Sequence, residues 1–308
     1  MKNTTSIVVT ILAWAAPALG HGYVYRVTAD NTVYPGWDVA LDPWLSPPPS
    51  RIAFGGGIVG PIINISSPNM ACNMARQPPA ATAVVRAGSN ITFHWSHWLR
   101  SHKGPITVWL APHSSPLSSL NVTDLSFFKI AQDTVDTAGI WANIRMMDSN
   151  KNTFTATIPA DIKPGKYIVR HEIAALHFSE GNKIPPGWES TAVGAQFYPH
   201  CFSVEVVGGR GEAVPEGVKF PGAYRVEDEG MRFDVRGGGG GRRYTPLGPE
   251  VYKGWATGGG VVDLEEREMV VVSPTGKGAE ADAAYFEAQR VFLEQQGAIV
   301  SYFDSIGG

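Results

Sequence analysis

The chain has 308 residues, of which 44% are hydrophobic and only 17% are charged. A net charge of −3 argues against a nucleic-acid-binding protein, which usually carries a basic face, so we expect no nucleic acid as a partner. The 35 glycines and 23 prolines argue against a helical bundle and favour a loop-rich β protein. Only two cysteines are present, which excludes thiolate metal clusters and small disulfide-dense scaffolds.

The first twenty residues have the pattern of a secretory signal peptide. Lys2 precedes an apolar run over 7–18, and the small residues Ala18 and Gly20 stand three and one positions before the expected cut. The alternative is a buried N-terminal strand. The run is too short to span a bilayer, and no later stretch reaches the length of about 18 apolar residues that a span needs. We therefore expect a secreted, extracellular, soluble monomer that begins at His21 and has no membrane partner.

The two cysteines take a different meaning in a secreted chain. In an oxidising route Cys72 and Cys201 can form one bridge. In the chain-entropy model, such a bridge would stabilise the folded protein by more than about 4 kcal/mol, because it closes a long loop. The alternative is two separate buried thiols. Three Asn-x-Ser/Thr sequons, at Asn64, Asn90 and Asn121, are candidates for glycosylation.

The predicted β-strands begin near the expected mature N-terminus. Residues 21–60 combine turn formers with aromatic residues, and they predict strands interrupted by long loops. Further strands are predicted from β-rich runs bounded by turn signals at 83–95 (two runs split by a Gly-Ser-Asn turn), 105–111, 153–158, 166–175 and 196–207. Strands at this spacing predict an all-β sandwich.

The C-terminal part of the chain is looser. The segment 208–254 contains five glycines at 237–241 and predicts an extended strap over the sandwich. Apolar residues at helix-like spacing predict one amphipathic helix within 280–300. We therefore divide the chain into a signal peptide (1–20), a sandwich domain (21–254) and a C-terminal extension (255–308) that is partly helical or disordered.

The chemistry lies in the histidines. If the chain is cut after Gly20, His21 carries an α-amine as well as its ring, and the two nitrogens can chelate one metal ion. A nitrogen from a second histidine would complete a planar site, and such nitrogen sets favour Cu(II). His102 is displayed on a glycine-bearing loop before a strand. Physics alone leaves the partner open, although four histidines are more typical of packing or surface positions: His94, His97, His113 and His200.

A set of motifs follows in order from the expected cut to about Gly254. They are His21-Gly22-Tyr23-Val24, Ser101-His102-Lys103-Gly104-Pro105, Arg170-His171-Glu172-Ile173-Ala174-Ala175-Leu176-His177, Gly194-Ala195-Gln196-Phe197-Tyr198-Pro199-His200-Cys201, Phe220-Pro221-Gly222-Ala223-Tyr224 and Gly248-Pro249. Together they resemble the fungal lytic polysaccharide monooxygenases of auxiliary-activity family 9. The resemblance implies an immunoglobulin-like or fibronectin-like β-sandwich with long loops and a flat copper-bearing face.

The resemblance also implies a role for each matching residue. His21 and His102 would hold one copper ion as a histidine brace, with Tyr198 as the axial ligand. His177 and Gln196 would act beside Tyr198 in catalysis, as hydrogen-bonding partners of the oxidant. The spacing of Gln196 and Tyr198 places both on one strand face, which fits joint action. The pair Cys72 and Cys201 would match the family's common disulfide.

The implied activity is copper-dependent oxidative cleavage of glycosidic bonds at C1 and/or C4. The expected partners are an insoluble or soluble polysaccharide, with cellulose favoured over associated β-glucan or hemicellulose, and an external electron donor (a small reductant or a redox protein). O₂ or H₂O₂ would be the oxidant. The alternative is a non-catalytic histidine-brace protein of the cell wall or of copper handling. Copper binding alone needs only His21 and His102, so the presence of His177, Gln196 and Tyr198 favours the enzyme.

Two features limit the match. The stretch 178–195 is longer than the family pattern leads us to expect, and an insertion there would lie beside the copper and could reshape the substrate face or displace His177. Trp109 stands where the family often has tyrosine, which we interpret as a packing change. For the substrate face, the aromatic residues of the N-terminal loops are candidates, with core packing as the alternative: Tyr23, Tyr25, Tyr34, Trp37 and Trp44.

Overall fold

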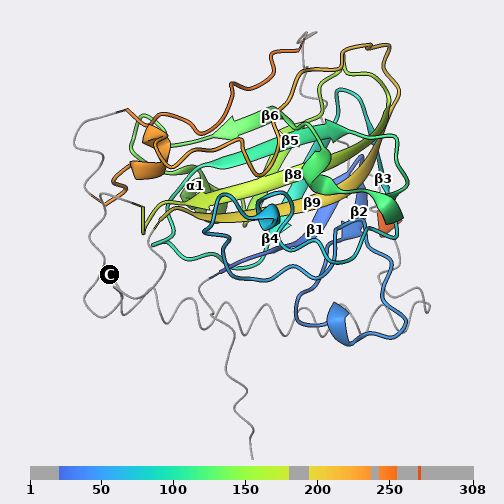
Figure 1. Ribbon diagram of the computed structural model, residues 1–308, viewed down its shortest axis with the longest axis horizontal. Helices are drawn as coiled ribbons and strands as arrows, with labels where there is room; N and C mark the ends of the chain where they lie inside the picture. Colours follow the sequence, from blue (N-terminus) through green and yellow to red (C-terminus); the bar gives the residue numbers. More distant parts are fainter. Residues whose placement is uncertain (1–20, 180–193, 237–242, 255–269, 272–308) are drawn as a thin grey trace, which may run out of the picture.

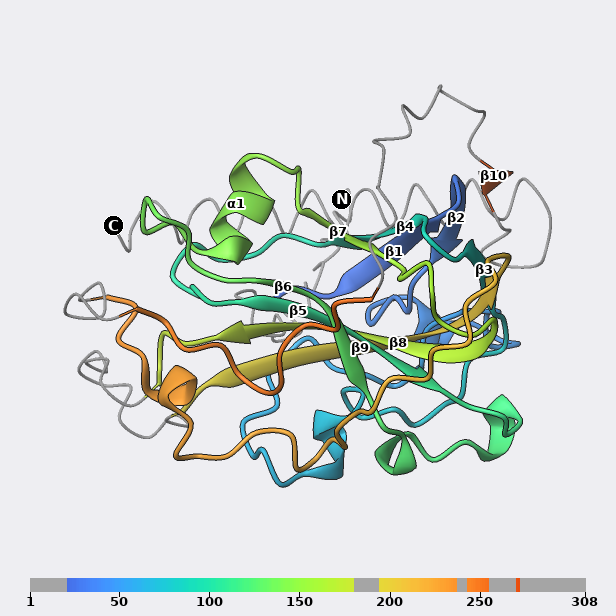
Figure 2. The ribbon, with the colours of Figure 1, turned by 90° about the horizontal axis from the view of Figure 1, so that it is seen from above.

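The protein is a sandwich of two β-sheets, as predicted. The computed structural model describes residues 21–179, 194–236, 243–254 and 270–271, and in Figures 1 and 2 the two sheets lie face to face. The strands are β1 (Val24–Ala29), β2 (Thr32–Pro35), β3 (Ala83–Arg86), β4 (Asn90–Trp95), β5 (Ile106–Pro112), β6 (Phe128–Asp133), β7 (Thr153–Thr157), β8 (Gly165–Ala175), β9 (Gln196–Val207) and β10 (Val270–Val271). No helix in this part of the chain is long and apolar enough to cross a membrane.

Each sheet has five strands. The first has the order β10-β2-β1-β4-β7, and the second has the order β3-β9-β8-β5-β6. The strands predicted from residue 83 onward are confirmed, and the turn at Gly88 separates β3 from β4 as expected. Sequence analysis missed β6 and the single α-helix of the described residues, α1 (Ala142–Asp148). Both are short, and α1 lacks a side-chain cap, so neither has a clear pattern.

Alternation along β8 builds two apolar layers. Tyr167 and Val169 point between the sheets, whereas Ile168 and Ala174 point to the outer side of the second sheet. The outer side is covered by loops that carry short 3-10 helices, and Figure 2 shows these loops below β8 and β9. They are η2 (Pro68–Met70), η3 (Leu117–Ser119), η4 (Val122–Asp124) and η5 (Glu229–Arg232), whereas η1 (Asp42–Trp44) lies in the loop that follows β2. Because both of its faces are covered, β8 is buried along most of its length.

The predicted strap crosses this outer layer. Phe220 and Tyr224 are buried in it, and the Tyr224 hydroxyl donates a hydrogen bond of 2.6 Å to a carboxylate oxygen of Glu172. The Arg170 guanidinium lies 3.7 Å from the centre of the Phe220 ring. Two buried polar side chains of β8 therefore anchor the strap. The glycine run at 237–241 and the predicted helix within 280–300 fall outside the described residues.

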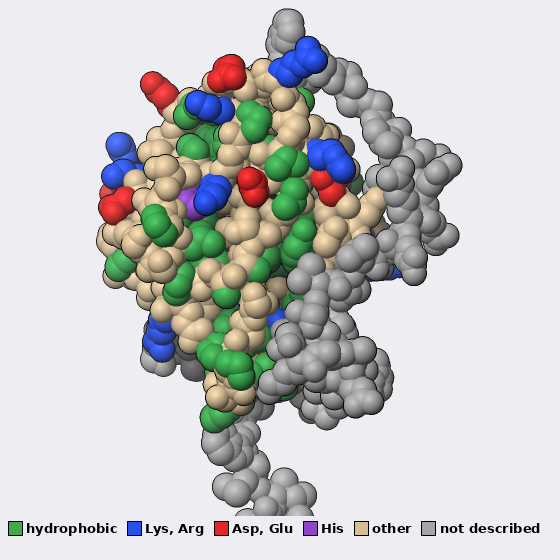
Figure 3. Space-filling view, turned by 90° about the vertical axis from the view of Figure 1, so that its right-hand side faces the viewer, with side chains coloured by type: hydrophobic (Ala, Val, Ile, Leu, Met, Phe, Trp, Pro, Cys, Tyr) green, Lys and Arg blue, Asp and Glu red, His purple; other side chains and the backbone are tan. Residues whose placement is uncertain are grey.

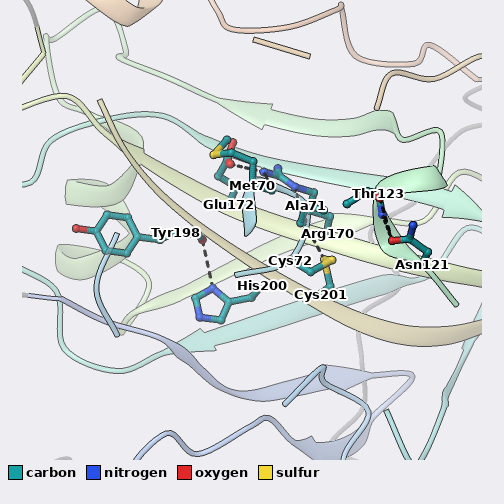
Figure 4. Close-up of a disulfide and its surroundings, with 10 residues drawn as sticks. All are labelled: Met70, Ala71, Cys72, Asn121, Thr123, Arg170, Glu172, Tyr198, His200 and Cys201. Carbon is teal, nitrogen blue, oxygen red and sulfur yellow. Dashed lines mark hydrogen bonds and ion pairs between the residues drawn. A yellow bond between two sulfur atoms is a disulfide. The ribbon is translucent and has the colours of Figure 1, made fainter. Parts of the chain in front are cut away.

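The predicted disulfide is present, so the alternative of two separate thiols is wrong. Cys72 follows η2 and Cys201 lies in β9, with 5.3 Å between their Cα atoms. Figure 4 shows the bridge beside Arg170, which donates hydrogen bonds of 2.9 and 2.8 Å to the carbonyl oxygens of Ala71 and Met70. The bridge and these bonds fasten the outer loop to the middle of the second sheet.

Candidate copper site

Residues from three distant segments meet at one end of the sandwich. The ring centres of His21 and His102 are 5.1 Å apart in an edge-to-face arrangement, and the Tyr198 ring is 5.5 Å from His21. His21 precedes β1, His102 lies in the loop between β4 and β5, and Tyr198 lies near the start of β9. The structure thus brings together the three residues that sequence analysis assigned to copper.

The His102 loop is held against β8 by its backbone. The Leu176 amide donates to the Lys103 carbonyl at 2.8 Å, and the Ala174 amide donates to the Pro105 carbonyl at 3.1 Å. A Cβ atom at Gly104 would lie 1.8 Å from the Ala174 carbonyl oxygen, so only glycine permits this approach. The glycine of the predicted loop motif therefore fixes how close His102 comes to the end of β8.

His102 is prepared to act as a neutral ligand. Burial above all, and then the nearby His177 and His21, hold the pKa of His102 well below its ordinary value. The Ser101 hydroxyl lies 3.0 Å from Nδ1 of His102. In a neutral ring whose Nδ1–H donates to that hydroxyl, Nε2 keeps the lone pair that binds a metal.

His177 packs directly on His102. Their ring centres are 3.8 Å apart, whereas most of the long stretch after Phe178 (180–193) lies outside the described residues. Burial, followed by His21 and Arg236, lowers the pKa of His177 to about 3. Its Nδ1 atom is buried and has no hydrogen-bond partner among the described residues. A neutral ring at this position has one N–H to donate and one nitrogen to accept a hydrogen bond.

Tyr198 and Gln196 complete the site beside the three histidines. Both point to the same side of β9, and the Tyr198 hydroxyl donates a hydrogen bond of 3.0 Å to Oε1 of Gln196. Burial raises the pKa of Tyr198 well above its ordinary value, so the group stays a phenol. A neutral phenol is a weaker metal ligand than a phenolate.

These residues favour a metal ion that accepts nitrogen ligands. No group of three or more His, Cys, Asp and Glu side chains in the described ranges is arranged to hold a metal. An ion at His21 and His102 thus needs a donor of another kind, and the α-amine of a chain that starts at His21 would be one. Mg²⁺ and Ca²⁺ take oxygen ligands, whereas an imidazole-rich set suits copper.

The other predicted candidates lie elsewhere. His94 contacts the Thr28 hydroxyl at 2.9 Å, and His113 contacts the Ser115 carbonyl at 3.1 Å, so both have local structural partners. His200 is half-buried and packs its ring edge-on against Trp95 with centres 5.0 Å apart, so it too has a structural contact. As expected, Trp109 is a packing residue, with no exposed surface.

The aromatic candidates for substrate contact divide into buried and exposed residues. Tyr23, Tyr34 and Trp37 are buried, so core packing explains them, whereas Trp44 is 77% exposed. On the side of the molecule that carries β3, charge does not mark a binding surface. Figure 3 shows basic and acidic side chains interspersed there among apolar and polar ones. Asn64, Asn90 and Asn121 are all exposed, as glycosylation requires.

Two residues of the site escaped sequence analysis. The indole N–H of Trp98 and the side-chain amide of Asn143 both donate to the His102 carbonyl. Asn143 is 41 positions from His102, and it lies in the helix that the sequence did not predict. No local pattern marks either residue, since the contacts exist only in the folded chain.

This fold and this site define a class: a β-sandwich with paired histidines and a buried tyrosine at one end. A family model described as Auxiliary Activity family 9 (formerly GH61) matches residues 21–244. The chain is 36% identical to AA9 family lytic polysaccharide monooxygenase A of Geotrichum candidum over 82% of this chain and 83% of the relative. It is 38% identical to monooxygenase B of Aspergillus fumigatus over 76% of this chain and 92% of the relative.

Solved structures agree with the family match. The extended catalytic domain of LPMO9A from H. jecorina superposes with a TM-score of 0.70 and 28% identity, over 83% of this chain and 99% of that one. A cellulose-active polysaccharide monooxygenase from M. thermophila has a TM-score of 0.64 and 27% identity, over 76% of this chain and all of that one. The chain belongs to auxiliary activity family 9. It is therefore a copper-dependent polysaccharide monooxygenase, from a family whose fungal members are secreted and use an external reductant.

Proposed function

We propose that the mature protein begins at His21 and cleaves cellulose or an associated β-glucan or hemicellulose oxidatively, at C1 and/or C4 of the glycosidic linkage. The single observation that carries the proposal is the meeting of His21, His102 and Tyr198 at one end of the sandwich, with ring centres 5.1 and 5.5 Å from His21. The cellulose-active relative named above supports this substrate. Release of residues 1–20 would create the amine that the brace needs.

His21 and His102 would hold the ion through their rings, and the His21 amine would complete the set of nitrogens. Copper, when bound, supplies one-electron redox chemistry and activates O₂ or H₂O₂. The burial that keeps His102 neutral also removes the competition between proton and metal for its ring. Tyr198 stays protonated and holds Gln196 through its hydroxyl, so it would be at most a weak ligand of the ion.

Gln196 and His177 would act on the oxidant through hydrogen bonds. Because Oε1 of Gln196 already accepts from Tyr198, its amide N–H groups are left to donate toward the metal side. The neutral ring of His177 carries one N–H and is fixed against His102. Donors that are in place before the reaction stabilise developing negative charge without a reorganisation cost.

Trp44 is our candidate for substrate contact. Trp44 is the last residue of η1, and its side chain is 77% exposed. An exposed aromatic ring buries apolar surface against the face of a sugar. The electron donor that serves the site would be a small reductant or a redox protein.

The experiment combines the copper-loaded protein with phosphoric-acid-swollen cellulose, ascorbate and O₂ or H₂O₂. We expect oxidised oligosaccharides by mass spectrometry, and none when either copper or ascorbate is left out. A protein that binds copper through three nitrogens, yet yields no oxidised product from any glucan or xylan, would be a non-catalytic copper-binding protein. The same mass spectra of the intact protein report whether His21 comes first.

A further inference from the structure

We propose that Asn143 is a positioning residue for the copper ligand His102, an inference that rests on the proposed function. The side chain of Asn143 is fully buried in α1, next to the His102 loop. Its Nδ2 atom donates to the His102 carbonyl, and its Oδ1 atom accepts from the Gly104 amide at 3.0 Å. We call this pair of bonds the Asn143 clamp.

The Asn143 clamp holds in place the backbone on either side of the His102 side chain. On one side of His102, its amide donates to the Leu99 carbonyl at 3.1 Å. On the other side, its carbonyl accepts from Asn143 and also from the indole N–H of Trp98 at 3.2 Å. With both flanking peptides fixed, the Cα–Cβ bond of His102 has one direction.

The helix α1, which carries Asn143, is itself fixed to its surroundings. Asp148 of α1 is ion-paired with Arg100, which lies in the His102 loop. Just past the helix, the Asn152 amide donates to the Met146 carbonyl at 2.9 Å, and the Asn152 carbonyl accepts from the Trp95 amide at 2.8 Å. These bonds tie the helix to the end of β4, so Asn143 holds the loop from an anchored element.

A carboxamide suits this position because the loop presents an acceptor and a donor together. An apolar side chain would leave the His102 carbonyl with the Trp98 bond alone and the buried Gly104 amide without its partner. Unsatisfied buried groups cost free energy, which the loop recovers by shifting. Any shift is transmitted to the His102 ring, and residues that orient a metal ligand typically change metal affinity 10–100-fold when they are replaced.

The test compares Asn143→Leu, which keeps the branched shape but replaces both polar atoms with methyl groups, with Met146→Ala, which removes buried apolar contacts from the same helix. Copper(II) affinity is measured by calorimetry, and the copper environment by electron paramagnetic resonance. We expect Asn143→Leu to weaken copper binding ~10–100-fold and to change the copper hyperfine splitting. Met146→Ala should lower the melting temperature and leave both copper readouts as in the wild type.

If Asn143→Leu does not fold, Asn143→Asp takes its place, since it keeps the acceptor for the Gly104 amide but sets an oxygen against the His102 carbonyl. A folded variant of either kind with wild-type affinity and spectrum would overturn the proposal. Failure of the proposed function looks different. In that case the wild-type protein itself would lack a three-nitrogen copper spectrum or would yield no oxidised sugars.

Discussion

Two groups of histidines in this protein look alike in burial and differ in what their rings face. The end group consists of His21, His102 and His177; the interior group consists of His94, His171 and His200. Burial is the first cause that lowers the pKa of His102, His177 and every member of the interior group. A lowered histidine pKa therefore does not by itself mark the metal site in this protein.

The partners of the rings separate the two groups. Nε2 of His171 accepts a hydrogen bond of 2.8 Å from the Trp95 indole, and its ring stacks on Phe93 with centres 4.2 Å apart. The rings of the end group contact one another at the end of the sandwich, where the centre of the His102 ring lies 5.1 Å from that of His21 and 3.8 Å from that of His177. The interior group is built for packing, and the end group is built for a ligand.

The largest effect that this comparison predicts is on copper affinity. His102→Ala removes a ring nitrogen of the brace, and we expect copper(II) binding to weaken about 1,000-fold, or ~4 kcal/mol. His94→Ala is the matched control, because it removes a histidine of the interior group and should leave the affinity unchanged. Isothermal calorimetry on both variants makes the measurement. Equal losses in the two would abolish the distinction between the groups.

The second effect is on stability. His171→Ala leaves a cavity beside Phe93 and removes the acceptor for the Trp95 indole. We therefore expect the free energy of unfolding, measured in urea, to fall by about 3 kcal/mol. The copper spectrum of the folded variant should match that of the wild type. A changed spectrum with unchanged stability would place His171 in the copper site instead.

Within the site, loss of a hydrogen-bond donor should separate binding from turnover. We expect Gln196→Ala to reduce the yield of oxidised oligosaccharides about tenfold or more, because a fixed donor near the oxidant is lost. Copper affinity should change by less than about threefold, since the amide is not a ligand. A parallel fall in affinity and product would instead make Gln196 part of the copper-binding set.

The smallest effect is a pH dependence of stability from the interior group. Burial lowers the pKa of His200 to about 4, whereas in the unfolded chain it returns to about 6.5. Between these values the unfolded state binds the additional proton, so the free energy of unfolding falls as the pH falls from 6.5 to 4. The share of His200 is on the order of 1 kcal/mol after discounting for its partial exposure.

The measurement is urea denaturation across this pH range in wild type and His200→Gln. The variant should show a flatter dependence on pH. Identical slopes for the two proteins would mean that the ring titrates normally in the folded state.

Sequence reasoning reached the fold because the β-rich runs, including those of β8 and β9, are bounded by turn signals at regular spacing. Which face of β8 points inward could be assigned only in the folded chain, where Tyr167 and Val169 lie between the sheets and Ile168 lies on the outer side. The motifs that resemble the family identified His21, His102 and Tyr198, whereas spacing alone left the partner of His21 open. Asn143 was out of reach, because its role depends on a short helix and on a contact across 41 positions.

The central claim is that a cut before His21 creates the copper site, and copper(II) electron paramagnetic resonance of the protein that starts at His21 tests it most directly. The comparison is the same protein with Gly20 retained, whose His21 nitrogen is an amide. We predict three nitrogen couplings and tight binding of one ion for the first protein, and a weaker site with a different spectrum for the second. Identical spectra and affinities for the two would contradict the account.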